Sequence, residues 1–105
     1  MKPKPPLEKD VQSAIIKYLR AKRLFFWKNN TVGIYKSSTG SYIPSGSVGS
    51  PDIFVLKDGL LYGLEVKRIG GKQSDAQINF GWSMNYHGGR YEVVFSIDDV
   101  IKLGL

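Results

Sequence analysis

The sequence predicts a single α/β domain, because helical and strand patterns alternate along its 105 residues. Between residues 7 and 22 apolar side chains recur three and four positions apart, which indicates an amphipathic helix with one buried stripe. Two apolar runs flank Asp58-Gly59, and this dipeptide between such runs is a strong signal for a two-residue hairpin turn. A second helix over residues 75–86 and a strand over residues 91–97 follow.

The remaining stretches complete this outline. A strand is expected over residues 24–30, and a short helix over residues 98–105 closes the chain. The Gly- and Ser-rich stretch 31–50 contains "IYK" and "SYI", which we expect to form a small hairpin. The basic, proline-rich residues 1–6 are expected to be flexible. No internal repeat or linker interrupts the sequence, so residues 1–105 are interpreted as one domain.

Composition narrows the function classes. The chain has 15 Lys and Arg against 9 Asp and Glu, a net charge of +6, which suits a polyanionic partner and nucleic acid first. It has no cysteine and one histidine, which excludes disulfides, thiolate nucleophiles and Cys/His zinc sites. A bound metal should therefore have oxygen ligands, as Mg²⁺ or Mn²⁺ does. No apolar run is long enough to span a membrane, so we expect no membrane partner. The expected location is the cytoplasm, either of the cell that encodes the protein or of a host cell if a phage encodes it.

The predicted turn places two carboxylates against each other. If Lys57 pairs with Leu60, Asp52 lies directly opposite Glu65, with Cβ atoms roughly 5 Å apart, and Lys67 is on the same face. Like charges in this position destabilise a sheet, so the pair requires a bound divalent cation or a raised pKa. In a metal site the backbone carbonyl of Val66 could supply a third oxygen. The alternative is a surface strand with an ordinary Glu65–Lys67 salt bridge.

Two other residues each have two readings. Ser74 to Gln77 matches the S-x-x-Q capping box, so Gln77 could cap the second helix, line the site, or do both. Glu8 in the first helical turn would interact favourably with the helix dipole, yet its spacing from Val11 and Ile15 extends the buried stripe toward a site.

We expect Trp27 and Trp82 to be core residues, as aromatics in strands and helices usually are.

Five further residues are candidates for contact with phosphates, with ordinary solvated side chains as the alternative for each. They lie mostly on glycine-rich stretches near the carboxylates: Lys28, Tyr35, Lys36, Arg68 and Lys72.

The ordered motif resembles a nuclease family. Pro51-Asp52, followed after twelve residues by Glu65-Val66-Lys67, resembles the PD-(D/E)xK nuclease superfamily. Gly49-Ser50-Pro51-Asp52 resembles the G-x-P-D motif of the virus-type replication-repair nuclease (VRR-NUC) domain. Glu8 and Gln77 lie where that family keeps a glutamate and a glutamine, and the resemblance covers nearly the whole chain.

This resemblance implies a restriction-endonuclease-like α/β fold, a central mixed β-sheet flanked by helices in the order α-β-β-β-α-β. It also implies Mg²⁺- or Mn²⁺-dependent cleavage, with Asp52 and Glu65 as metal ligands and Lys67 as the catalytic lysine. Glu8 would be a further ligand, directly or through water, and Gln77 a further site residue.

The sequence shows no recognition helix or zinc module, so a structure-specific substrate is favoured over a sequence-specific one. We therefore expect a metal-dependent, structure-specific DNA endonuclease. In the family that the sequence resembles, small stand-alone members resemble junction-resolving enzymes that work as homodimers, and a two-fold dimer matches the two strands to be cut in a four-way junction. The resemblance thus implies a Holliday-junction resolvase that acts as a homodimer. The alternatives are a flap, branched-DNA or single-stranded DNA nuclease, and a non-catalytic nucleic-acid-binding module.

Overall fold

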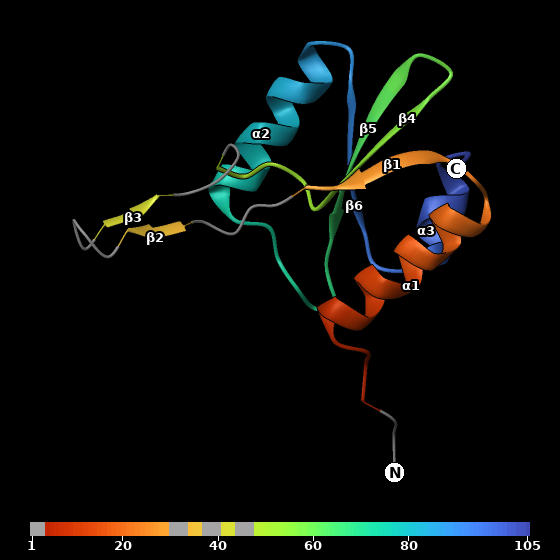
Figure 1. Ribbon diagram of the computed structural model, residues 1–105, viewed down its shortest axis with the longest axis horizontal. Helices are drawn as coiled ribbons and strands as arrows, with labels where there is room; N and C mark the ends of the chain where they lie inside the picture. The colour runs from red at the N-terminus through yellow and green to blue at the C-terminus, as the bar shows by residue number, and fades with distance from the viewer. Residues whose placement is uncertain (1–3, 30–33, 37–40, 44–47) are drawn as a thin grey trace.

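The computed structural model describes residues 4–29, 34–36, 41–43 and 48–105 (Figure 1). The helices and strands in these ranges follow the expected order. They are α1 (Glu8–Ala21), β1 (Phe25–Lys28), β2 (Ile34–Lys36), β3 (Ser41–Ile43), β4 (Ile53–Lys57), β5 (Leu60–Val66), α2 (Asp75–Tyr86), β6 (Arg90–Val94) and α3 (Ile97–Lys102).

The main sheet has four strands in the order β1-β4-β5-β6. The first two pairings are antiparallel, whereas β5 and β6 are parallel, so the sheet is mixed as expected. Helices α1 and α3 lie on one side of this sheet and α2 lies on the other, which gives three layers (Figure 1). The small hairpin predicted from "IYK" and "SYI" is present as the antiparallel pair β2–β3.

Helix α1 forms because its apolar residues follow the helical period. Val11, Ile15 and Leu19 are buried and pack on the core face of the sheet, as the pattern predicts. This core also contains the alternate residues of the hairpin strands and the end of the chain: Ile53, Val55, Tyr62, Leu64, Val66, Val94, Val100 and Leu105. The opposite face of β4 and β5 is thereby left for α2 and for the polar residues of the motif.

The Asp58-Gly59 turn sets the register of the hairpin. Both turn residues have positive φ, 51° and 78°, as a two-residue turn of type I′ requires. Lys57 pairs with Leu60 and Ile53 pairs with Leu64, so the predicted register is confirmed. Asp52, one residue before Ile53, therefore comes opposite Glu65.

Several predicted boundaries were wrong by a few residues. Of the described residues in the strand expected over 24–30, only those of β1 are in strand conformation, and the strand expected over 91–97 ends at Val94. The last helix starts earlier than expected, because Ser96 caps it by accepting a hydrogen bond from the Asp99 N–H at 3.3 Å.

The two tryptophans are not core residues. Trp27 lies on edge strand β1, where Phe26 faces the core, so Trp27 points to the other face and stacks on Phe54 with ring centroids 5.2 Å apart. Trp82 is 77% exposed, because α2 turns Gly81 toward the sheet instead. Alternation along each element outweighs the general tendency of aromatic side chains to be buried.

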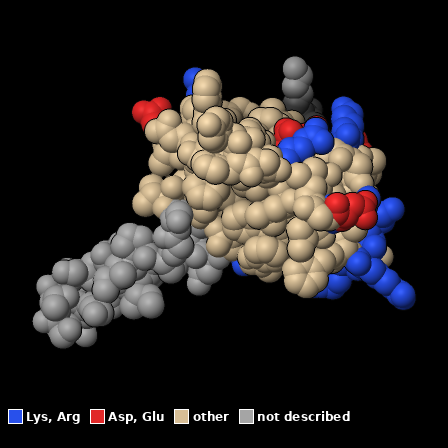
Figure 2. All heavy atoms as spheres, turned by 90° about the horizontal axis from the view of Figure 1, so that it is seen from above, with Lys and Arg blue, Asp and Glu red and all other residues tan. Residues whose placement is uncertain are grey.

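Residues 1–3 of the expected flexible segment lie outside the described part of the chain, and residues 4–6 form no helix or strand. Among the described residues no helix is both long and apolar enough to cross a membrane. In the view of Figure 2 most Lys and Arg side chains lie toward the side of α1 and α3, and much of this face is uncharged.

Candidate metal centre at the opposed carboxylates

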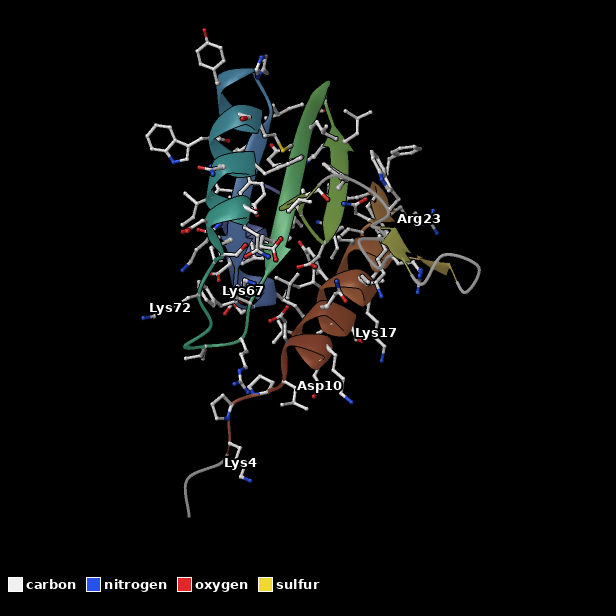
Figure 3. All side chains as sticks on the ribbon, turned by 90° about the vertical axis from the view of Figure 1, so that its left-hand side faces the viewer. Lys4, Asp10, Lys17, Arg23, Lys67 and Lys72 are labelled. Carbon is white, nitrogen blue, oxygen red and sulfur yellow. The ribbon has the colours of Figure 1, made fainter. Side chains whose placement is uncertain are left out.

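Asp52 and Glu65 meet at the end of the hairpin where β4 begins and β5 ends. The Val66 N–H donates a hydrogen bond to Asp52 Oδ2 at 2.7 Å, which fixes the aspartate across the strand pair. Glu65 is only 2% exposed although it carries a carboxyl group. Lys67 follows two residues later and is partly buried on the same face, with its Nζ 3.5 Å from Glu65 Oε1. Figure 3 shows Lys67 at the end of β5, between α1 and α2.

Other elements supply hydrogen-bond donors to the Glu65 carboxyl group. From the first turn of α2, Gln77 Nε2 donates to Glu65 Oε1 at 2.8 Å. From β6, the Tyr91 hydroxyl donates to Glu65 Oε2 at 3.4 Å. Both oxygens of a buried acid therefore have partners, which offsets part of the cost of removing it from water.

The surroundings of Glu65 favour its protonated form. Burial is the main cause and the charge of Asp52 the second, and together they raise the pKa of Glu65 to about 8 although Lys67 opposes the change. Burial and the nearby Glu65 also raise the pKa of Tyr91. At neutral pH these surroundings therefore favour a proton on the carboxyl pair.

Gln77 forms the predicted capping box and also contacts Glu65. Its Oε1 accepts from the Ser74 N–H at 2.9 Å while its own N–H donates to Ser74 Oγ at 3.2 Å, which completes the capping box. The remaining end of the same amide, Nε2, is free to bind Glu65. The cap therefore fixes the orientation of the amide toward the site.

The segment before Asp52 is held by contacts that the sequence did not reveal. Asn29 Nδ2 donates to Ser50 Oγ at 2.7 Å and to the Pro51 carbonyl at 2.9 Å, and the Asn29 N–H donates to the Asp52 carbonyl at 2.8 Å. Gly49 has a φ of +84°, and a Cβ there would overlap the Ala76 carbonyl in α2. Glycine thus allows this segment to rest on the helix that carries Gln77.

Glu8 is placed differently from the expectation. It is exposed in the first turn of α1 and does not continue the buried stripe, because the helix starts there and Val11 is its first buried residue. No group of three or more His, Cys, Asp or Glu side chains that could hold a metal is found in the described residues. The structure thus brings Asp52, Glu65, Lys67 and Gln77 together, and the role of Glu8 as a ligand stays a prediction.

The candidate phosphate-binding residues fall into two groups. Arg68 and Lys72 are exposed on the loop between β5 and α2, and Lys28 is exposed at the end of β1. The side chains of Tyr35 and Lys36 lie outside the described part of the structure. In Figure 3 Lys67 and Lys72 lie toward the same end of the molecule.

The donor set fits a hard divalent cation. Asp52 and Glu65 offer carboxylate oxygens, Val66 adds a backbone carbonyl next in the chain, and Cys is absent from the sequence. The charges of these two opposed acids repel each other, and Mg²⁺ or Mn²⁺ bound between them would stabilise the pair. The single ammonium group of Lys67 cannot neutralise both.

Comparison with solved structures finds a similar chain described as a VRR_NUC domain. The two chains are 23% identical, the match covers 91% of each, and the TM-score is 0.65. The chain therefore has the fold of a VRR_NUC domain, which confirms the expected restriction-endonuclease-like architecture. No family model and no curated protein matches significantly.

The raised pKa of Glu65 has a measurable consequence for stability. In chelator, the free energy of unfolding should fall as pH rises from about 4.5 toward 8, because the unfolded glutamate loses its proton near 4.5 while the folded one retains it to about 8. Glu65→Gln should remove this slope and be more stable than the wild type at pH 8, by an amount on the order of a few kcal/mol. Urea unfolding across this pH range measures both.

Glu92→Gln serves as the matched control, because Glu92 is a half-buried surface acid that forms an ion pair with Arg90 at 3.0 Å. Equal pH slopes for the wild type and Glu65→Gln would contradict the assignment of Glu65 as the buried, protonated acid.

Proposed function

We propose that the protein is a metal-dependent endonuclease of the PD-(D/E)xK type that hydrolyses phosphodiester bonds in DNA. The observation that carries the proposal is the opposition of Asp52 and buried Glu65, with the Lys67 ammonium group 3.5 Å from Glu65. Ordinary strand packing gives no reason for two acids there, whereas phosphodiester hydrolysis requires a divalent cation and a nearby positive charge. The fold shared with a VRR_NUC domain supports this choice.

Each residue has a role in this proposal. Asp52, Glu65 and the Val66 carbonyl would hold Mg²⁺ or Mn²⁺, and Glu8 would add a further ligand directly or through water. The bound ion would polarise the scissile phosphate and lower the pKa of a water molecule. Lys67 would place its ammonium group against the developing negative charge on the phosphate. Gln77 would hold the Glu65 carboxylate in position through its 2.8 Å hydrogen bond.

The proposed substrate is argued from the charge of the domain and from its lack of a sequence-reading module among the described residues. The net charge of +6 suits a polyanion, and Lys36, Arg68 and Lys72 are candidates for contact with its phosphates. The short helices of the described residues carry no evident sequence-reading module, so DNA shape is the better determinant. We therefore favour a Holliday-junction resolvase, with flap, branched or single-stranded DNA as the second choice of substrate.

Cleavage of end-labelled DNA tests this proposal. In Mg²⁺ or Mn²⁺ the wild type should nick a four-way junction symmetrically, and chelator should abolish cutting. Asp52→Ala and Lys67→Ala should each lower the rate at least about a hundredfold, because each removes a group that acts on the reacting phosphate. Lys17→Ala, on the exposed side of α1, is the control and should cut normally.

The outcomes separate the alternatives. Cutting of flaps or single strands alone would retain the nuclease and discard the resolvase. DNA binding without cutting in either metal would favour the non-catalytic binding module. Normal cutting by Asp52→Ala would contradict the metal site.

A homodimer is proposed because a four-way junction has two strands to cut and a two-fold dimer matches it. Helix α2, which starts at the site, presents an exposed apolar stripe at a spacing of four residues, formed by Ile78, Trp82 and Tyr86. Monomeric proteins rarely expose such continuous apolar patches, so this stripe is the surface we assign to the second copy.

Trp82→Glu should convert the dimer to a monomer, because a charge at the centre of an apolar contact must be buried without a partner. Light scattering after gel filtration measures the mass. The control is Ile101→Glu, which places the same charge on an exposed apolar position of α3. A Trp82→Glu protein that keeps the dimer mass would exclude α2 as the interface.

A further inference from the structure

A second concave surface lies beside the carboxylate site. The segment before α1 and the loop after β5 enclose a cleft of about 400 Å³, which we call the basic cleft. Its lining comes from both segments: Lys4, Pro5, Leu7, Arg68, Ile69 and Gly70. It adjoins the site along the chain, because its lining residue Arg68 directly follows Lys67. In Figure 3 Lys4 lies on the chain segment that leads into α1, below Lys67 and Lys72.

The charge of the basic cleft fits a polyanion. Lys4 and Arg68 are its charged lining residues, and no acid lines it. Within the described part of the chain neither side chain forms an ion pair or a side-chain hydrogen bond, and both are exposed. Two cations that converge from segments 64 positions apart in sequence, with no acidic partner, are placed to contact successive phosphates of one strand.

The apolar residues of the basic cleft indicate whether the bound DNA strand is paired or unpaired. Leu7 is 48% exposed and Ile69 is 68% exposed. Ile69 is held outward by a tight turn, in which the Gly71 N–H donates to the Arg68 carbonyl at 2.8 Å and Gly70 has a φ of +87°. Exposed aliphatic side chains next to phosphate-binding cations suit the faces of unstacked bases, which a continuous duplex keeps covered.

We propose that the basic cleft binds an unpaired or unstacked DNA strand adjacent to the scissile phosphate, with Lys4 and Arg68 on phosphates and Leu7 and Ile69 against base faces. This inference rests on the proposed nuclease function. Binding of an unpaired strand in the basic cleft would let the protein distinguish branched from plain duplex DNA. It gives the chain segment before α1 a direct part in substrate binding.

Fluorescence anisotropy in chelator tests the inference apart from cleavage. The probes are a single strand, a fork and a fully paired duplex of the same sequence, each measured over a range of salt concentrations. Lys4→Ala/Arg68→Ala should bind the single strand and the fork about tenfold more weakly, with the salt slope for the single strand reduced by about 1.4. Lys17→Ala/Arg20→Ala removes the same charge from exposed positions of α1, roughly 14–18 Å along the helix from Glu8, and should stay within about twofold of wild type.

Ile69→Ser tests the apolar part separately. It should leave the salt slope unchanged but reduce the preference for fork over duplex, because it removes the base contact and keeps both cations. Thermal unfolding should show equal stability for all variants, since the substituted side chains are exposed.

The inference is overturned if Lys4→Ala/Arg68→Ala binds as tightly as Lys17→Ala/Arg20→Ala, or if anionic lipid vesicles bind through these residues and DNA does not. A protein that binds forks through the basic cleft but cuts nothing in Mg²⁺ or Mn²⁺ would overturn the proposed function and leave this inference intact. A protein that cuts DNA equally well with either pair of substitutions would overturn this inference and leave the proposed nuclease function intact.

Discussion

The burial of the Glu65 carboxyl group opposite Asp52 is the constraint on which the rest of the site depends. Two carboxylates removed from water in adjacent positions repel each other and lose hydration, so the site must neutralise them. Gln77, Tyr91 and the Val66 N–H supply hydrogen bonds, and Lys67 supplies one positive charge. These partners leave one negative charge uncompensated, which a proton on Glu65 or a divalent cation can balance. The arrangement of these side chains therefore suits the cation that we propose.

Much of the local architecture maintains this arrangement. The turn at Asp58-Gly59 sets the register that aligns the acids, and the Ser74 cap orients the Gln77 amide. Helix α2 can approach the sheet because Gly81 faces the Tyr91 ring, where a Cβ would lie 2.8 Å from a ring carbon. The same close approach brings Gln77 of α2 to Glu65. The packing of α2 on this side of the sheet therefore also positions the side chains of the candidate site.

The extent to which the sequence predicted this site depends on the range of each signal. The proximity of Asp52, Glu65 and Lys67 was predicted because turn chemistry and strand alternation act over a few residues. Tyr91 was missed because it reaches Glu65 through the parallel pairing of β5 with β6, a contact between positions 26 apart that leaves no local pattern. The exposure of Trp82 was missed for a related reason, since the close packing of α2 on Tyr91 decides which of its faces is buried. The helix and strand order needed only local patterns and was predicted fully.

Titration calorimetry of Mn²⁺ into the protein near pH 7, in two buffers of different ionisation enthalpy, would show whether a cation binds between Asp52 and Glu65. If the cation binds between Asp52 and Glu65, it must displace the proton held by a group whose pKa is raised to about 8. We expect one binding event that releases close to one proton in the wild type, weak or absent binding in Asp52→Asn, and weaker binding without proton release in Glu65→Gln. Equal affinity and equal proton release in the wild type and both variants would mean that the metal binds elsewhere and that Asp52 and Glu65 are not its ligands.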